Sequence, residues 1–241
     1  MSYRISKESI IFLDIETVPQ YKHFDEVPIP LRKLWEEKIT RQKLLKENET
    51  MAESFGRGGL YAEFGKIVCI VTGYFEKGIF HLRSFSSDDE RTLLTKFSEF
   101  IHNFSNYKKG NFTLCAHNGK EFDYPYMARR MIVNSMKIPE ILDNAGKKPW
   151  EVHLLDTLEL WKFGDYKAYT SLNLLAHILG LPSPKQDMDG SMVGTAYWQN
   201  KELEKIVKYC CNDVMTLANV YLRIKGDAIF EQDDVIYDKT A

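Results

Sequence analysis

The sequence lacks the features that mark membrane, secreted and zinc-stabilised proteins. Its 241 residues contain no apolar run close to the ~20 residues that a membrane-spanning helix needs. The N-terminal residues 1–4 begin no apolar stretch of the kind that a secretory signal requires. The four cysteines show no C-x-x-C spacing, which argues against a zinc ribbon or a disulfide framework. We therefore expect no membrane partner and a location in the reducing cytoplasm.

An excess of basic charge is also missing. Lysine and arginine total 32 against 34 aspartates and glutamates, which gives a net charge of −2. No global positive field can attract polyanions, so any affinity for nucleic acid must come from a local patch or from bound metal. Hydrophobic residues make up 44% of the chain, enough for the core of one large domain. We place this domain at residues 1–226 and a frayed C-terminal tail at 227–241.

The apolar pattern predicts an α/β fold with a mixed five-stranded sheet. Five segments are rich in β-branched and aromatic residues, and Glu76-Lys77-Gly78 is a turn that should join the second and third as a hairpin. The predicted strands are residues 9–16, 67–75, 79–85, 112–116 and 152–157.

Helices should flank this sheet. Apolar residues recur at helical spacing in four segments, and acidic or hydroxyl residues stand at several of their starts. The predicted helices are residues 88–101, 123–135, 171–179 and 201–224, with a loop over about 182–195 before the last. Residues of about 25–60 have a helical face of their own and end in Gly56-Arg57-Gly58-Gly59, so we interpret them as a helical insertion that ends in a flexible hinge.

Acidic residues stand where predicted strands and helices meet. Asp14 and Glu16 close the apolar run of the first strand, and residues two apart project from one face of a strand. Asp123 begins a helix just after the fourth strand, and Asp213 shares a helical face with Tyr209, four residues before it. Clustered carboxylates repel one another unless a cation holds them, and oxygen-only clusters suit Mg²⁺ or Mn²⁺. We expect these acids to bind two such cations.

The three motifs resemble a known family. A D-x-E motif at a strand end, H-N-x-x-x-F-D at residues 117–123 and Y-x-x-x-D at 209–213 are similar to the DEDDy-type 3′–5′ exonucleases of the RNase H-like superfamily. Where another branch has histidine five residues before the last aspartate, this chain has Lys208. Residues 63–70 and 183–191 are further similar to stand-alone bacterial predicted exonucleases related to the proofreading domain of family B DNA polymerases. One departure is that Asn118 lies five residues before Asp123, one more than in many members, so the turn there should differ.

This resemblance implies a function and a role for each motif residue. It implies that Asp14, Glu16, Asp123 and Asp213 ligate two divalent cations, Mg²⁺ or Mn²⁺, and that Tyr209 orients the attacking water. It implies a metal-dependent 3′–5′ exonuclease that hydrolyses single-stranded DNA or RNA from the 3′ end and releases nucleoside 5′-monophosphates. Because 241 residues leave no room for a polymerase domain, a role in proofreading or repair would need a partner protein. The alternative is a catalytically inactive RNase H-like module that binds nucleic acid or a protein partner.

Several other residues admit two interpretations each. Asp156 either ligates metal or caps the next helix, and capping is favoured. The histidines 117, 153 and 177 lie among apolar residues, so we expect hydrogen-bonded core or supporting positions. Arg129 and Arg130 either touch phosphates or lie on a solvated helix face, which is the expectation. Cys210 and Cys211 are expected to be packing residues of the last helix.

Overall fold

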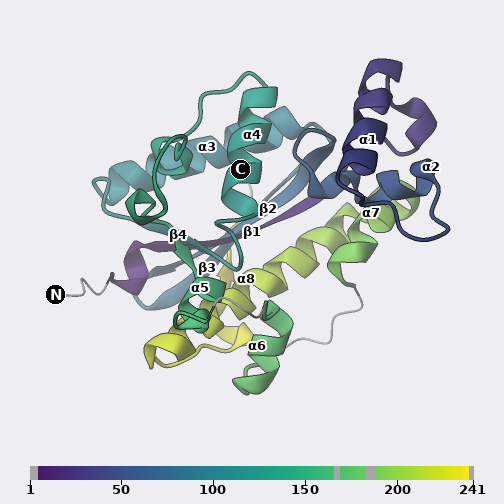
Figure 1. Ribbon diagram of the computed structural model, residues 1–241. Coiled ribbons are helices and arrows are strands. Elements are labelled where there is room, and N and C mark those ends of the chain that lie inside the picture. Colours follow the sequence, from purple (N-terminus) through teal and green to yellow (C-terminus); the bar gives the residue numbers. More distant parts are fainter. Residues whose placement is uncertain (1–4, 166–168, 183–187, 239–241) are drawn as a thin grey trace.

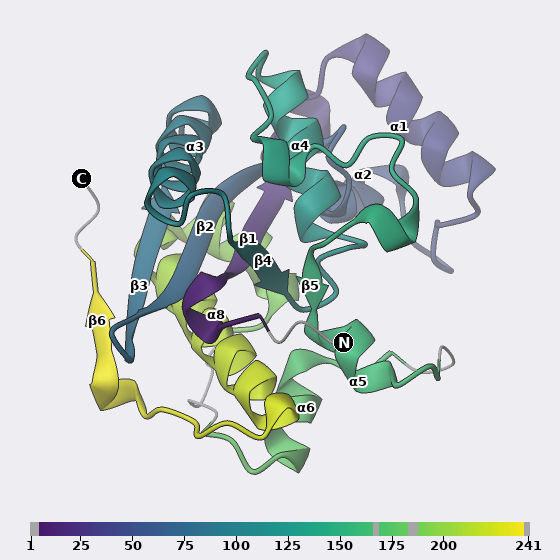
Figure 2. The same cartoon turned by 90° about the vertical axis from the view of Figure 1, so that its left-hand side faces the viewer.

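A mixed β-sheet is the framework of the computed structural model, which describes residues 5–165, 169–182 and 188–238. Within these residues the sheet has six strands in the order β5-β4-β1-β2-β3-β6, which Figure 2 shows side by side. Neighbours β1, β2 and β3 are antiparallel, whereas the pairs β1–β4, β4–β5 and β3–β6 are parallel. The strands are β1 Ile10–Pro19, β2 Gly65–Glu76, β3 Ile79–Ser86, β4 Thr113–Ala116, β5 Leu155–Asp156 and β6 Val235–Tyr237.

Helices cover both faces of this sheet, and each face has its own hydrophobic core. In Figures 1 and 2, α3 and α4 lie on one side of the sheet and α8 lies on the other. Odd-numbered apolar residues of β1 such as Ile11 and Leu13 pack with α3 and α4, and the even-numbered Phe12 packs with α8. The helices are α1 Ile29–Arg41, α2 Met51–Ser54, α3 Glu90–Tyr107, α4 Asp123–Val133, α5 Thr157–Lys162, α6 Leu172–Ile178, α7 Val193–Thr195 and α8 Leu203–Lys225.

Local sequence signals account for most of the boundaries of these elements. The predicted hairpin is confirmed, and its turn residues Lys77 and Gly78 both have positive φ, as a type I′ turn requires. Asp89 caps α3 by accepting the N–H of Thr92, and Ser171 caps α6 in the same way. Gly226, with φ of 73°, ends α8 in the left-handed conformation that glycine adopts without strain.

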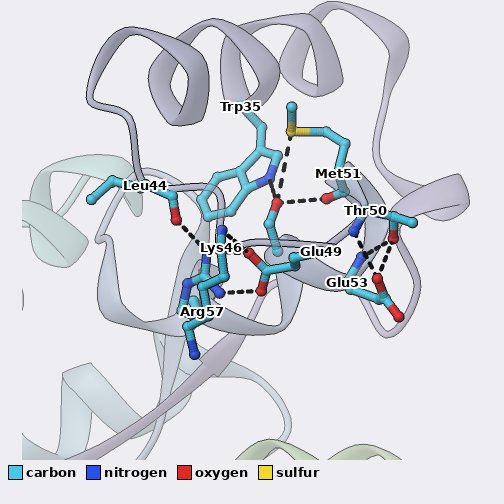
Figure 3. Close-up of polar contacts among 9 residues, drawn as sticks. Trp35, Leu44, Lys46, Glu49, Thr50, Met51, Glu53 and Arg57 are labelled. Atoms are coloured by element: carbon cyan, nitrogen blue, oxygen red, sulfur yellow. Dashed lines mark hydrogen bonds and ion pairs between the residues drawn. The ribbon is translucent and has the colours of Figure 1, made fainter.

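The expected helical segment between residues 25 and 60 is present and has a hydrophobic cluster of its own around Trp35. The Trp35 indole N–H donates to Ser54 at 3.0 Å, and Arg57 pairs with Glu49 and donates to the Leu44 carbonyl (Figure 3). The predicted flexible hinge is wrong, because residues 55–60 form a 3₁₀ helix.

Packing explains why the glycines of this 3₁₀ helix do not act as a hinge. Gly58 and Gly59 are buried, and a Cβ on Gly59 would lie 3.0 Å from the backbone of Val18. The Gly59 carbonyl accepts hydrogen bonds from Thr17 and Tyr126, each at 2.8 Å. Position 59 is glycine because the chain passes so close to β1 there.

The C-terminal segment corrects the prediction of five strands and a frayed tail. Residues 235–237 form β6, which adds a sixth strand beside β3 at the edge of the sheet (Figure 2). Asp238 fixes this strand, since its carboxylate accepts from the Tyr74 hydroxyl at 2.6 Å and its N–H donates to the Leu82 carbonyl at 2.8 Å. The strand satisfies edge groups of β3 that would otherwise face solvent, a tertiary contact that local sequence does not announce.

Two smaller expectations also need correction. The fifth strand is limited to Leu155–Asp156, because α5 begins directly after it. The loop predicted over about 182–195 contains a 3₁₀ turn at Gly190–Met192 followed by α7, and a π-helix at Ala196–Asn200 leads on to α8. Residues 183–187 of that predicted loop lie outside the described residues.

Candidate metal centre

Strand β1 carries the first two acids of the predicted site. Asp14 lies opposite Val71 of β2 and Glu16 lies opposite Cys69, so both side chains project from the same face of the sheet. The prediction that they end the strand is wrong, because β1 continues to Pro19 after a β-bulge between Glu16 and Thr17. They reach the site for another reason: the pairing of β1 with β4 extends only through Ile10–Phe12. Beyond Phe12 that side of β1 is open to the start of α4.

The third acid, Asp123, is the first residue of α4, as predicted. The turn before it is tight, because Asn118 has a positive φ of 60° and a Cβ on Gly119 would lie 2.4 Å from the Ala116 side chain. Asp123 is 3% exposed, and its carboxylate accepts a hydrogen bond from the backbone N–H of Ile15. That contact ties the start of α4 to β1 between Asp14 and Glu16.

Helix α8 supplies the remaining two predicted residues from the opposite side. Tyr209 and Asp213 are one turn apart, and the Tyr209 hydroxyl hydrogen-bonds to the Asp213 carboxylate. Between them, the Cys210 Sγ lies 3.4 Å from the Asp14 Oδ2. The sequence analysis predicted that Cys210 is only a packing residue. It does pack in the core between the sheet and α8, but its contact with Asp14 brings a thiol to the acids as well.

Mutual repulsion shows in the protonation of these acids. Burial, followed by the charges of Glu16, Asp123 and Asp213, raises the pKa of Asp14 well above its ordinary value. Burial, followed by the charges of Cys69, Asp213 and Asp123, raises the pKa of Glu16 as well, and burial raises the pKa of Asp123 to about 7. The structure thus brings all four predicted carboxylates within electrostatic reach of one another, from β1, α4 and α8.

Tyr209 is held in its neutral form. Burial comes first and the charges of Asp213 and Glu16 follow, and together they raise its pKa far above the ordinary value of a phenol. The neutral phenol is therefore the favoured form near neutral pH. The hydroxyl can donate a hydrogen bond or orient a neighbouring molecule, but it cannot take up a proton as a general base.

The donor set of this centre fits a hard divalent cation. Among the described residues, Oδ1 of Asp123 is a buried oxygen without a hydrogen-bond partner. A buried acceptor that stays unpaired costs free energy, and a cation that it ligates removes that cost. A cation would also relieve the repulsion between Asp14 and Glu16. Carboxylate oxygens are the ligands that Mg²⁺ and Mn²⁺ prefer.

Asp156 takes the capping role. Its Oδ1 accepts the N–H of Leu158 in the next helix, α5, at 2.9 Å. The same oxygen accepts the N–H of Asn118 at 2.9 Å. Its Oδ2 accepts the N–H of Lys120 at 3.1 Å. Both oxygens are used by backbone donors, so this carboxylate holds the start of α5 and the turn that leads to Asp123.

The three histidines differ in their surroundings. His117 is a supporting residue as predicted: its ring nitrogens lie 2.8 Å from the Thr157 hydroxyl and 2.9 Å from the Thr170 carbonyl, and burial lowers its pKa. The prediction is wrong for His153 and His177, which are exposed. Neither ring is in the core that the neighbouring apolar letters suggested.

Arg130 is a further residue whose surroundings differ from the prediction. It is 3% exposed and forms an ion pair with Glu90, with the shortest N–O distance 2.6 Å, so the predicted solvated face is wrong for it. The Glu90 carboxylate also accepts the N–H of Ile67 at 2.8 Å. The spacing of Arg130, three residues after the buried Met127, was the available signal that it faces the core. Its neighbour Arg129 is exposed, as expected.

A separate surface hollow lies away from the acids. It has a volume of about 920 Å³ and is bordered by α3, the start of β4 and residues 137–154. None of the five predicted site residues lines it. Its lining includes the acids Glu140, Asp143 and Glu151, but none of the motif residues, so it is not the place of the predicted chemistry.

The fold is RNase H-like, with a mixed sheet that helices cover on both faces. Among solved structures, the chain is similar to the family B DNA polymerase from the hyperthermophilic archaeon Pyrobaculum calidifontis, with a TM-score of 0.51 and 16% sequence identity. The similarity covers 88% of this chain and 24% of the polymerase chain, so it corresponds to about a quarter of that protein.

The amino-acid sequence also assigns the chain to a family. It belongs to the family of predicted 3′–5′ exonucleases related to the exonuclease domain of PolB, whose model matches residues 60–233. The match includes Asp123, Tyr209 and Asp213, whereas Asp14 and Glu16 lie before its first residue. No curated protein matches the chain. Within the described ranges, every helix is too short or too polar to span a bilayer.

Proposed function

We propose that the protein is a metal-dependent 3′–5′ exonuclease that hydrolyses single-stranded nucleic acid and releases nucleoside 5′-monophosphates. The observation that carries this proposal is the convergence of four carboxylates with the unpartnered Oδ1 of Asp123, in a member of a predicted exonuclease family. The reacting phosphodiester is anionic and repels an anionic nucleophile. A site for its hydrolysis therefore needs concentrated positive charge, which four carboxylates hold as bound cations.

In this proposal Asp14, Glu16, Asp123 and Asp213 hold two divalent cations, Mg²⁺ or Mn²⁺. When bound there, the ions would supply positive charge to the anionic phosphate. Tyr209, kept neutral by its surroundings, orients the attacking water through its hydroxyl. Its hydrogen bond to Asp213 fixes the direction of that hydroxyl, so that orientation is set before the substrate enters.

Partner and compartment follow as further parts of the proposal. The substrate is a 3′ end of single-stranded DNA or RNA, and a polymerase or repair protein is the partner if the activity serves proofreading. A cytoplasmic location is supported by the four cysteines, which are all free thiols. The competing reading, an inactive module that binds nucleic acid or a partner, receives no support from the acids, because none of the four is replaced.

The proposal is tested on oligonucleotides labelled at the 5′ end, as DNA and as RNA, single-stranded and duplex. With Mn²⁺ or Mg²⁺ the single strands should shorten stepwise from the 3′ end, and mononucleotides should appear. A blocked 3′ terminus should stop the reaction, and the Asp123→Asn variant should be inactive. Cleavage of circular single strands would indicate an endonuclease instead, and absence of products with either metal would support the inactive module.

A further inference from the structure

A thiol lies inside the carboxylate cluster. The Cys210 Sγ is 3.4 Å from Oδ2 of Asp14 and 3.5 Å from its backbone carbonyl oxygen. Three potential ligand atoms lie within 4.8 Å of one another, one each from Asp14, Glu16 and Cys210. This separation lets a single ion contact all three. The cluster therefore offers two hard oxygen donors and one soft sulfur donor from facing elements, β1 and α8.

A second thiol stands next to the first. Cys69 is directly opposite Glu16 in the pairing of β1 with β2, and its thiol is close enough to act on the pKa of the Cys210 thiol. Both cysteines are fully buried. Both thiols thus lie beside the acids, since Cys210 contacts Asp14 and Cys69 acts electrostatically on Glu16. Among the described contacts of Asp14 with a thiol, both are made by Cys210, so Cys211, the next residue along the helix, offers a matched control.

An independent observation concerns the third acid of the centre, Asp123. Oδ1 of Asp123 is buried and has no hydrogen-bond partner among the described residues, and its carboxylate acts electrostatically on Asp14. A ligand that fills the centre is thus expected to be positively charged. The chemistry of the donors then decides which ions it accepts, because sulfur selects soft or borderline ions and oxygen alone selects hard ones.

We propose that this centre also binds a thiophilic divalent cation, Zn²⁺ or Cd²⁺, through Asp14, Glu16 and Cys210, in competition with Mg²⁺ or Mn²⁺. When the metal–sulfur bond forms, the thiol proton of Cys210 passes to solvent and the metal keeps its oxidation state. The competition rests on the proposed function, because it assumes that the hard ions use Asp14 and Glu16. The sulfur bond itself needs no exonuclease activity.

The direct test uses Cd²⁺ with the full chain after removal of metals by a chelator. Formation of a cadmium–thiolate bond gives an ultraviolet charge-transfer band, which should saturate at one ion per chain in the wild type. The band should be lost in Cys210→Ser and kept in Cys211→Ser. Excess Mn²⁺ should weaken it in the wild type, because both ions use Asp14. Absence of the band in the wild type, or an equal band in Cys210→Ser, would overturn the inference.

A second measurement does not depend on any variant folding. X-ray absorption of the wild type loaded with one equivalent of Zn²⁺ should show a sulfur neighbour at the Zn–S distance of about 2.3 Å. A shell of oxygen and nitrogen alone would contradict the inference. The outcomes also separate the two proposals: nucleotide release without a sulfur neighbour refutes this one alone, and a sulfur neighbour without nucleotide release refutes the proposed function alone.

Discussion

Asp156 accepts the backbone N–H of Asn118 at 2.9 Å, so residues 38 positions apart in the sequence share one hydrogen bond beside the acidic centre. The same carboxylate accepts the N–H groups of Lys120 and Leu158. Asn118 and Lys120 belong to the turn that ends at Asp123. Asp156 therefore acts as a positioning residue, because it holds the turn from which a predicted ligand projects.

The first prediction concerns Asp156→Asn. Its amide has one acceptor oxygen where the carboxylate has two, so a backbone donor loses its partner and unfolding should become easier by about 1–3 kcal/mol. Binding of Mn²⁺ should weaken but keep its stoichiometry. Urea unfolding and calorimetric titration measure the two effects. Glu159→Gln, at an exposed residue, is the control. Unchanged stability with one metal lost would mean that Asp156 is itself a ligand.

The second prediction separates two residues of α8. Asp213→Asn removes a charge from the centre, and it should abolish most activity while the stability of the metal-free protein stays the same or rises. Tyr209→Phe keeps the ring but removes the hydroxyl, and it should lower the rate by about 10²–10³-fold, as removal of one positioned hydrogen-bonding group does. Its Mn²⁺ affinity should barely change. Single-turnover rates and thermal melting provide the measurements. Wild-type rates in both variants would remove these residues from the site.

The third prediction concerns pH and metal together. The pKa of Asp123 is raised to about 7 in the folded chain, above the value of about 3.9 in an unfolded one. Between these values the folded state holds a proton that the unfolded state has lost. This extra proton on Asp123 stabilises the folded state relative to the unfolded one. The contribution is complete below about pH 4 and disappears as the pH rises through about 7.

This pH dependence is measured by urea unfolding of the metal-free protein from pH 5 to pH 8. The free energy of unfolding should fall less with rising pH in Asp123→Asn than in the wild type. His117 is present in both proteins, so its contribution cancels when the two are subtracted. Added Mn²⁺ should raise the melting temperature most at the higher pH, where the acids are ionised. An unchanged melting temperature at millimolar Mn²⁺ would contradict the proposed metal centre.

The fourth prediction tests the buried ion pair of Glu90 and Arg130. Arg130→Met removes one partner and leaves a buried carboxylate uncompensated, which should reduce the free energy of unfolding by about 3–5 kcal/mol. The neighbouring exposed Arg129→Met is the matched control and should have little effect. Chemical denaturation of both variants makes the comparison. Similar stabilities would show that the pair contributes little.

Much of the fold could be predicted from the sequence, because the signals involved are local. Alternating apolar residues, a Lys-Gly turn and capping side chains such as Asp89 act within a few residues, and they produced the hairpin and most helix starts. The sixth strand could not be predicted this way. Val235–Tyr237 is a strand because β3 offers it an edge, and nothing near residue 235 in the sequence encodes that edge.

The sequence by itself determined which residues can carry the chemistry: the acids, their spacing and the tyrosine one helical turn before Asp213. Only the tertiary structure decided what surrounds them. In the folded protein β1 continues past Glu16, and the Asp123 carboxylate contacts the backbone of Ile15. Both oxygens of Asp156 accept backbone N–H groups, and the thiol of Cys210 contacts Asp14. The physical reason is that protonation and ligand choice depend on burial and on charges from other elements. Those neighbours are distant in the chain and adjacent only in the folded protein.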